Sequence, residues 1–230
     1  MSLTANKITK KFFRKTSSAN FFYALEETNL ELEKGKLTVV TGRSGSGKTT
    51  LLTILAGLLS PSEGEVLIDN KSIYSLPDKE LSKLRNEKIG FIPQDSAAIF
   101  SLNVLENVLL PIMMYRNVTD EDREYALSLL GIFDIDSLSD AMPGELSGGE
   151  LRRMSIARAL VNKPEFIFAD EPTGDLDDEN TLEVLKYLKG IAESGIAVIM
   201  VTHENEALSF ADKAYRMSGG RLTEEKVSEN

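Results

Sequence analysis

The stretch that decides the fold reads Gly42-Arg43-Ser44-Gly45-Ser46-Gly47-Lys48-Thr49. A β-rich apolar run, residues 36–41, precedes it, and a Leu/Ile/Ala-rich segment with helical spacing, residues 50–59, follows it. The glycines therefore lie at a turn from a strand to a helix, the context in which G-x-x-x-x-G-K-[ST] predicts a phosphate-binding P-loop. The alternative is a glycine-rich loop that only turns the chain.

The residue types in this loop suit a polyphosphate. Without Cβ atoms, Gly42, Gly45 and Gly47 let backbone N–H groups converge on one small anion, and the positive end of the following helix adds attraction. Lys48 can reach the terminal phosphates, and the Thr49 hydroxyl can bind Mg²⁺. The residues expected to contact the nucleotide here are Gly42, Arg43, Ser44, Gly45, Ser46, Gly47, Lys48, Thr49 and Thr50.

Composition limits the classes of function. A formal net charge of -10 over 230 residues argues against a nucleic-acid partner, because binding to a phosphate backbone relies on a basic face. The chain has no cysteine, which excludes disulfides and thiolate metal sites and suits a reducing cytosol. Residues 1–4 are too polar for a signal peptide, and no stretch approaches the roughly 20 apolar residues that span a bilayer. We therefore expect the chain to stay where it is made and to reach a membrane only through a partner.

The N-terminal part of the chain indicates mostly strands. Apolar and polar residues alternate over residues 7–40, with a turn-forming stretch at 16–20, so antiparallel strands are expected. Further elements expected before residue 95 are a strand at 65–70, a helix at 76–87 and a short buried strand at 89–93.

The pattern then changes twice. Residues 95–160 have helical spacing, in which Thr119 is a candidate helix cap. Continuous apolar runs at 166–169 and 197–201 indicate strands buried on both faces, with a helix between them. Strands that alternate with helices predict a parallel sheet with right-handed crossovers, whose ligands bind beyond the carboxyl ends of the strands.

We expect one α/β domain over residues 1–230, a P-loop NTPase fold with a mostly parallel central sheet. Residues 1–94 and 161–230 are expected to form the ATP-binding core with an N-terminal antiparallel β subdomain, and about 95–160 an inserted α-helical subdomain. The polar tail at 223–230 is expected to fray.

Two carboxylates follow the strand at 166–169 directly. Asp170 is placed to hold Mg²⁺ through water, which completes the site that Thr49 begins. Glu171 is the candidate general base, or the residue that orients the water, for attack on the γ-phosphate. The alternative is a pair of solvated acids at a strand end, which the neighbouring P-loop disfavours.

Two further polar residues also come directly after strands. The amide of Gln94 can bind Mg²⁺ or contact the attacking water, and His203, the only histidine, is expected to face the γ-phosphate. Taken alone, Gln94 is more often an ordinary loop residue and His203 a surface or capping residue. The expected catalytic set is Lys48, Gln94, Glu171 and His203, and the expected metal ligands are Thr49, Gln94 and Asp170.

A second anion-binding turn reads Leu146-Ser147-Gly148-Gly149-Glu150 and precedes a segment with helical spacing. Ser147 can cap that helix, and the two glycines leave its first N–H groups uncovered. The alternative is only a well-capped helix start. One chain does not obviously need two phosphate sites, so the residues alone leave the role of this turn open.

Together these pieces resemble the nucleotide-binding subunit of an ATP-binding cassette (ABC) transporter over nearly the whole chain. Six motifs occur in the family's order: the P-loop at 42–49, the Q-loop at Gln94, the signature motif at 146–150, the Walker B strand at 166–171, the D-loop at 174–177 and the H-loop at His203. The run at 168–177 looks most like the subgroup that drives lipoprotein release, macrolide efflux and antimicrobial-peptide export or resistance.

The resemblance implies a Mg²⁺-dependent ATPase that forms a head-to-tail homodimer when ATP is bound. In such a dimer the signature turn closes the ATP of the opposite subunit and the D-loop links the two sites. The trans contacts implied are Ser147, Gly148, Gly149, Glu150 and Asp177. ATP closes the dimer, hydrolysis reopens it, and the motion passes to an integral-membrane permease through a groove beside Gln94 and the helical subdomain. The subunit then lies on the cytoplasmic face of the cell membrane, held there by its permease.

The chain departs from the family pattern in two places. The family usually stacks adenine on a tyrosine, and the matching position here is Phe12, with Phe13, Phe22 and Tyr23 as competitors. The signature motif ends in Glu150 where many members carry glutamine.

Other classes of function share these motifs. An ABC ATPase of a mechanotransmission or signalling complex, which moves no solute, has the same residues. A soluble ABC protein that acts on DNA or ribosomes is disfavoured, because such relatives usually add coiled coils, zinc-binding cysteines or a second cassette. The motifs do not specify a cargo, because the permease selects it.

Overall fold

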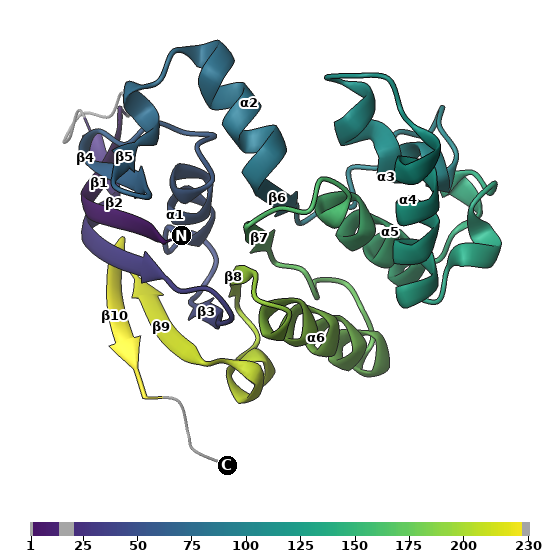
Figure 1. The fold of residues 1–230 in the computed structure, drawn as a ribbon. Coiled ribbons are helices and arrows are strands. Elements are labelled where there is room, and N and C mark those ends of the chain that lie inside the picture. The colour runs from purple at the N-terminus through teal and green to yellow at the C-terminus, as the bar shows by residue number, and fades with distance from the viewer. Residues whose placement is uncertain (1, 14–20, 227–230) are drawn as a thin grey trace.

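A six-stranded sheet forms the centre of the computed structural model, which describes residues 2–13 and 21–226 (Figure 1). Its strands are β3 (Leu37–Thr41), β6 (Ile89–Ile92), β7 (Phe166–Asp170), β8 (Ala197–Thr202), β9 (Lys213–Ser218) and β10 (Arg221–Glu225). They lie in the order β10-β9-β3-β8-β7-β6, and only the β9–β10 pair is antiparallel in this described sheet. The mostly parallel sheet predicted from the alternation of strands and helices is confirmed.

The second sheet is antiparallel. It contains β1 (Leu3–Phe13), β2 (Phe21–Leu32), β4 (Glu63–Ile68) and β5 (Lys71–Ser72), in the order β2-β1-β4-β5. The long strand β1 pairs with both β2 and β4. This sheet is the antiparallel structure expected near the N-terminus, whereas the turn expected at 16–20 lies outside the described residues.

Helices cover both faces of the central sheet and extend the molecule to one side. The α-helices are α1 (Lys48–Leu55), α2 (Asp78–Lys88), α3 (Val104–Met113), α4 (Asp120–Ile132), α5 (Gly148–Leu160) and α6 (Asp178–Glu193). Short 3-10 helices are η1 (Ile73–Ser75), η2 (Asp136–Leu138), η3 (Pro143–Glu145) and η4 (Asn205–Phe210). Helices α3, α4 and α5 lie together, away from the antiparallel sheet (Figure 1).

Successive residues of β7 serve two separate cores. Phe166 and Phe168 belong to the buried cluster that contains the apolar residues of α1 and the antiparallel sheet. Ile167 and Ala169 belong to the cluster formed by α3, α4, α5 and α6. Because side chains alternate across a strand, a strand covered on both faces must be apolar throughout, and this explains the continuous run in the sequence.

Side-chain caps fix where four of the described α-helices begin, and α3 is capped by Asn103. The side chains of Thr119, Ser147 and Asp177 each accept a hydrogen bond from the backbone N–H three residues further on. The caps predicted at Thr119 and Ser147 are confirmed. Since such a bond satisfies an N–H group that lacks a helical partner, substitution of a cap costs about 1 kcal/mol.

The expected fraying of the tail is wrong for its first residues. Arg221–Glu225 form strand β10, which pairs along β9, and the Nε atom of Arg216 lies 2.5 Å from a carboxylate oxygen of Glu225. The edge of β9 supplies backbone partners for a strand whose own side chains are mostly polar. Residues 227–230 lie outside the described part.

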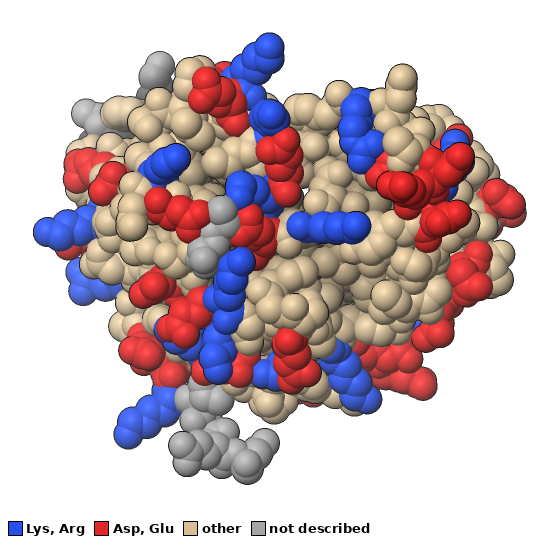
Figure 2. Space-filling model, viewed as in Figure 1, with Lys and Arg blue, Asp and Glu red and all other residues tan. Residues whose placement is uncertain are grey.

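The outer surface is charged and mixed in sign. Figure 2 shows lysine and arginine side chains interspersed among aspartate and glutamate over the visible face. Within residues 2–13 and 21–226, no helix combines the length and the apolar character that a bilayer crossing needs.

Asn107 organises the loop between β6 and α3. Its side chain is fully buried; its Nδ2 atom donates to the carbonyl oxygens of Ile99, Leu102 and Asn103 at 3.0, 2.9 and 2.9 Å, and its Oδ1 atom accepts from the Ile99 N–H at 2.8 Å. One amide thus satisfies four backbone groups of this loop.

We predict that Asn107→Leu lowers the free energy of unfolding by about 1–3 kcal/mol, because the loop's backbone groups lose their buried partner. Urea unfolding followed by circular dichroism measures the change. The matched control is Asn117→Leu, at an exposed position, which should change stability by less than about 0.5 kcal/mol. Equal effects of the two substitutions contradict the role assigned to Asn107.

Candidate nucleotide-binding site

The glycine-rich loop lies between the buried strand β3 and helix α1, as the sequence predicts. Gly47 is the residue before α1, with φ of 110°, and no side chain caps the helix or places an acid in its first turn. The first N–H groups of α1 are therefore available to an anion at the positive end of the helix dipole.

Close packing explains why the loop needs glycine. A Cβ atom on Gly47 would lie 2.2 Å from the carbonyl oxygen of Ala24, and one on Gly42 would lie 2.4 Å from that of Met217. Gly45 also has a positive φ, 76°, but a Cβ atom there would meet nothing within 4 Å. The loop is thus pressed against neighbouring strands at two points and open at the third.

Lys48 is held across the inside of the loop. Its ammonium donates to the carbonyl oxygen of Gly42 at 2.7 Å and lies 3.1 Å from a carboxylate oxygen of Glu171. Only 5% of its surface is exposed. A buried cation needs such partners, because an unpaired one costs several kcal/mol.

Thr49 and Asp170 join the loop to the end of β7. The Thr49 hydroxyl donates to a carboxylate oxygen of Asp170 at 3.1 Å, and Asp170 is buried. Burial raises the pKa of Asp170, and the nearby charge of Glu171 raises it further, while the Thr49 bond and Lys48 oppose the rise. A hydroxyl and a carboxylate are oxygen ligands of the kind that Mg²⁺ takes.

The donor set fits Mg²⁺ bound together with phosphate. Among the described residues, no group of three or more histidine, cysteine, aspartate or glutamate side chains could hold a metal alone. Mg²⁺ usually takes one or two carboxylates plus substrate phosphates and keeps several waters. A site of one hydroxyl and one carboxylate beside a phosphate-binding loop meets that requirement.

Glu171 lies between Lys48 and His203. One carboxylate oxygen pairs with Lys48, and the other lies 2.8 Å from Nδ1 of His203 and accepts from the His203 backbone N–H at 3.1 Å. Burial raises the pKa of Glu171, but the bonds with His203 and Lys48 outweigh it, so the net pKa lies below the ordinary value. Glu171 is therefore ionised at neutral pH. A carboxylate held this way can orient a water or accept its proton.

Most of the predicted cis residues meet in one cavity of about 420 Å³. It is lined by Phe22, Ser44, Gly45, Gly47, Lys48, Thr49, Thr50, Gln94, Glu171 and His203. Gly42, Arg43, Ser44 and His203 also line a neighbouring cavity of about 480 Å³. Ser46 is buried beneath the loop, where its N–H donates to the carbonyl of Arg43 at 3.1 Å.

The aromatic residue that lines the cavity is Phe22, not Phe12. Phe12 packs against Phe22 with ring centroids 5.9 Å apart and an interplanar angle of 31°. The two residues are paired across β1 and β2, which places them side by side. The sequence names both as candidates, and the sheet order distinguishes them, because β2 is the edge strand next to α1 whereas β1 is internal.

The signature turn is absent from this cavity. Ser147 and Glu150 bond each other at the start of α5: the Ser147 hydroxyl lies 2.7 Å from a Glu150 carboxylate oxygen, which also accepts from the Ser147 N–H. The hydrogen bond from the Ser147 backbone N–H lowers the pKa of Glu150 most, and the bond from the Ser147 hydroxyl lowers it further. Gly149 lies against Asn180, whose side chain donates to Asp177 at 2.9 Å. The predicted trans residues Ser147, Gly148, Gly149, Glu150 and Asp177 thus form a group of their own, separate from the residues that line the P-loop cavity.

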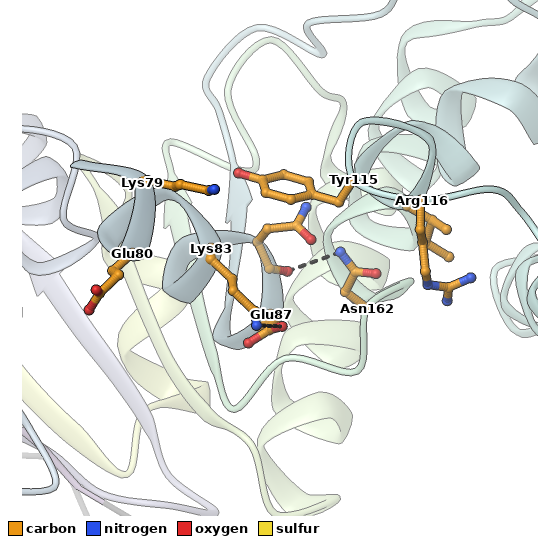
Figure 3. Close-up of a pocket in the computed structure, with 9 residues that line it drawn as sticks. Lys79, Glu80, Lys83, Glu87, Tyr115, Arg116 and Asn162 are labelled. Atoms are coloured by element: carbon orange, nitrogen blue, oxygen red, sulfur yellow. Dashed lines mark hydrogen bonds and ion pairs between the residues drawn. The ribbon is translucent and has the colours of Figure 1, made fainter. Parts of the chain in front are cut away.

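A groove of about 600 Å³ separates α2 from the end of α3 (Figure 3). Tyr115 reaches across it and donates its hydroxyl to the carbonyl of Ser82 at 3.0 Å. The groove is lined by Lys79, Glu80, Lys83, Asn86, Glu87, Ile112, Tyr115, Arg116 and Asn162. Exposed Met113 and Met114 adjoin it in the sequence. Charged and amide side chains thus share one concave surface with Ile112 and Tyr115.

Sequence reasoning missed two contacts near the site. The fully buried Thr173 hydroxyl donates to the carboxylate of Glu204, which links the segment after Glu171 to the segment after His203. Arg152 of α5 donates to the carbonyl oxygens of Pro93 and Gln94. No local pattern reports either contact, because the partners lie 31 and 58 or more residues apart.

The fold and the site define a P-loop nucleotide-binding protein: a glycine-rich loop after a central strand, with a lysine and a hydroxyl facing acids at the end of a parallel strand. A family profile described as ABC transporter matches residues 25–174. The chain belongs to the ABC transporter family. Within this family it is an ATP-hydrolysing cassette.

Named relatives agree. The chain is 43% identical over 204 residues to the lipoprotein-releasing system ATP-binding protein LolD of Aquifex aeolicus, covering 87% of this chain and 90% of that protein. It is 41% identical over 201 residues to an uncharacterised ABC transporter ATP-binding protein of Methanocaldococcus jannaschii, covering 87% and 90%. It is 38% identical over 203 residues to the macrolide export ATP-binding/permease protein MacB of Chlorobium luteolum, covering 88% of this chain and 30% of that protein.

A solved structure matches the whole fold. The ATP-binding cassette MJ0796 of Methanocaldococcus jannaschii, in a dimeric post-hydrolysis state bound to ADP and Pi, superposes with a TM-score of 0.88 at 35% identity. The match covers 99% of this chain and 100% of that one.

We predict that two glycine substitutions in the loop differ in cost. Gly45→Ala should lower the free energy of unfolding by about 1–2 kcal/mol, the cost of a left-handed conformation. Gly47→Ala should cost about 3–5 kcal/mol, because overlap with the Ala24 carbonyl adds to that strain. Urea unfolding of the nucleotide-free protein measures both. Equal losses contradict the close approach of Gly47 to β2.

Proposed function

We propose that this chain is the ATPase subunit of a transporter, that two copies close on ATP head to tail, and that the closure drives a separate integral-membrane permease. One observation carries the proposal: the P-loop, Glu171 and His203 share a cavity from which the Ser147 turn of the same chain is absent. A second copy gives that turn a phosphate to bind. The dimeric state of the similar cassette MJ0796 supports this arrangement.

In the proposed site, the loop residues Gly42 to Thr50 hold the phosphates of ATP, and Lys48 neutralises charge on the terminal ones. Thr49, Asp170 and Gln94 hold Mg²⁺, which when bound neutralises charge on the β- and γ-phosphates. Glu171 accepts a proton from the attacking water or orients it, and His203 holds Glu171 in place. Either Phe12 or Phe22 stacks on adenine, and Phe22 is the better placed.

The opposite subunit completes each site in this proposal. Gly148 and Gly149 present uncovered N–H groups at the start of α5, and Glu150, which accepts from the N–H and the hydroxyl of Ser147, holds the turn in shape. Asp177 lies beside the turn through Asn180 and links the two sites. In the proposed domain division, residues 1–94 and 161–230 form the core and about 95–160 the helical subdomain that carries the turn.

The groove between α2 and α3 is the proposed contact for the permease. Its mixture of charged, amide and apolar groups suits an amphipathic segment of another protein (Figure 3). The subunit would then lie on the cytoplasmic face of the cell membrane, held by its partner. The proposal includes no nucleic-acid partner, because a net charge of -10 disfavours binding to a phosphate backbone.

The names of the relatives suggest the direction and class of cargo. Relatives named for lipoprotein release and macrolide export favour export or release of a lipophilic, peptide or drug-like substrate. Pull-down of the permease, followed by a flux assay in vesicles, tests this part of the proposal. A partner that moves no solute favours a signalling or mechanotransmission complex instead.

We predict that Glu171→Gln slows ATP hydrolysis by about 100-fold or more, because the amide cannot accept a proton. ATP binding and dimer formation should persist. Steady-state phosphate release and size-exclusion chromatography with light scattering measure the two properties. The control is Glu193→Gln at an exposed carboxylate of α6, which should hydrolyse at the wild-type rate. Near-normal turnover of Glu171→Gln removes Glu171 as the catalytic carboxylate.

We predict that adding Ser147→Asp to Glu171→Gln abolishes the ATP-dependent dimer. Aspartate also caps helices, so α5 should stay folded, but its charge repels the phosphate of the opposite subunit. Light scattering with saturating Mg-ATP measures the oligomer, and Ser137→Asp, at an exposed serine, is the control. A dimer that persists in the variant carrying both substitutions refutes the trans contact; a Glu171→Gln parent that stays monomeric refutes the dimer itself.

A further inference from the structure

Arg152 of α5 holds the first residues after strand β6. Its two terminal nitrogens donate to the carbonyl oxygens of Pro93 and Gln94, at 2.6 and 2.5 Å. Only 5% of Arg152 is exposed, although arginine is rarely buried this far. The guanidinium fork suits two adjacent acceptors, so the contact fixes the backbone at Gln94 as well as its neighbour.

Arg158, further along α5, extends the same contact. Its terminal nitrogens donate to the carbonyl oxygens of Ser96 and Ala97, at 2.6 and 2.8 Å. Ala97 has φ of 45°, a left-handed conformation that is unfavourable for alanine and persists only where its surroundings impose it. Two arginines of one helix therefore bind four of the five carbonyl groups from residue 93 to 97.

The burial of these arginines is costly. Burial lowers the pKa of both Arg152 and Arg158, and the charges of Asp95 and Asp175 partly offset the effect at Arg152. Burying a cation against neutral carbonyl groups costs free energy unless each hydrogen bond is well made. An apolar residue at position 152 would avoid this cost, so the arginine requires an explanation beyond stability.

The rest of this loop is also held by the helices. Asn107 of α3 binds backbone groups of Ile99, Leu102 and Asn103. Between residues 93 and 103, these side-chain contacts come from α3 and α5. A movement of α5 relative to the central sheet therefore carries the backbone of Gln94 with it.

We propose that Arg152 is a positioning residue for hydrolysis: it couples the placement of Gln94 in the subunit's own site to the placement of the Ser147 turn on the same helix. The inference rests on the proposed function, in which Gln94 acts in cis and Ser147 in trans. When the turn engages the opposite nucleotide, α5 fixes Gln94 beside the nucleotide of its own subunit. Arg158 supports the same segment.

A double-mutant cycle tests this inference. The variants are Arg152→Met, Gln94→Ala, both together, and Arg152→Lys, assayed for steady-state ATPase activity with Mg-ATP. Arg152→Met should lower kcat by about 10- to 100-fold, as expected when a catalytic group is misplaced. KM for ATP should change by less than about threefold, because the P-loop is untouched. Arg152→Lys, which keeps the charge and one donor direction, should restore part of kcat.

The double variant gives the deciding result. If Arg152 acts through Gln94, the double variant should turn over within about twofold of Gln94→Ala alone. The control is Arg85→Met, which removes an arginine that likewise donates to a loop carbonyl, but to that of Gly57 rather than to one of residues 93–97. In the variant that carries both Arg85→Met and Gln94→Ala, kcat should fall by the product of the two single-variant factors.

The two possible failures are distinguishable. Suppose that Gln94→Ala lowers kcat and that adding Arg152→Met lowers it again by the same factor as Arg152→Met does alone. The positioning role is then wrong while the proposed function stands. If Gln94→Ala hydrolyses ATP at the wild-type rate, the role proposed for Gln94 fails, and the inference about Arg152 fails with it. If Arg152→Met does not fold, Arg152→Lys takes its place in the cycle. The inference is then overturned if the kcat of the double variant falls by the product of the two single-variant factors.

Discussion

The ion pair between Lys48 and Glu171 is the contact on which the rest of the site depends. It joins the start of α1 to the end of β7 at 3.1 Å, with both side chains largely buried. Because the second oxygen of Glu171 bonds to His203 after β8, the ends of three neighbouring strands are held in one arrangement. Buried charges tolerate little displacement, since each separated charge costs several kcal/mol. In the proposed site, positive and negative groups are therefore preorganised where charge would develop during phosphoryl transfer.

Strained backbone occurs within this arrangement, at Glu171, and in the segment after β6, at Ala97. Glu171 and Ala97 both have φ of 45°, which costs about 1–3 kcal/mol for a residue with a side chain. Glu171 is held there by its N–H bond to Val201 at 2.8 Å, and Ala97 by the bond from Arg158. Strain of this kind persists only when surrounding contacts outweigh it. At Glu171 the strained turn aims the carboxylate back toward Lys48, whereas an extended continuation of β7 would carry it away.

Local chemistry explains what the sequence predicts well. The P-loop, the buried strand before Asp170 and the caps Thr119 and Ser147 depend on residues close together in the chain. Contacts between distant segments are harder to foresee. Phe22 rather than Phe12 lines the cavity because β2 is the edge strand next to α1, and Arg152 reaches carbonyl groups 58 and 59 residues away. The strand at Arg221–Glu225 is not predicted because its side chains are mostly polar, while its backbone pairs with β9.

Helix α5 shows why the two proposed sites of a dimer are not independent. Its N-cap is Ser147, which we propose contacts the opposite nucleotide, while Arg152, little more than one turn later, holds the backbone of Gln94 in the subunit's own proposed site. A helix of 13 residues is stiff over that distance, so the turn and Gln94 move together. In the proposed dimer, ATP bound to one subunit would thereby change the geometry around ATP in the other. By linkage the effect is reciprocal for binding, and two-fold symmetry makes it equal at the two sites. Closure on two nucleotides is then favoured over closure on one.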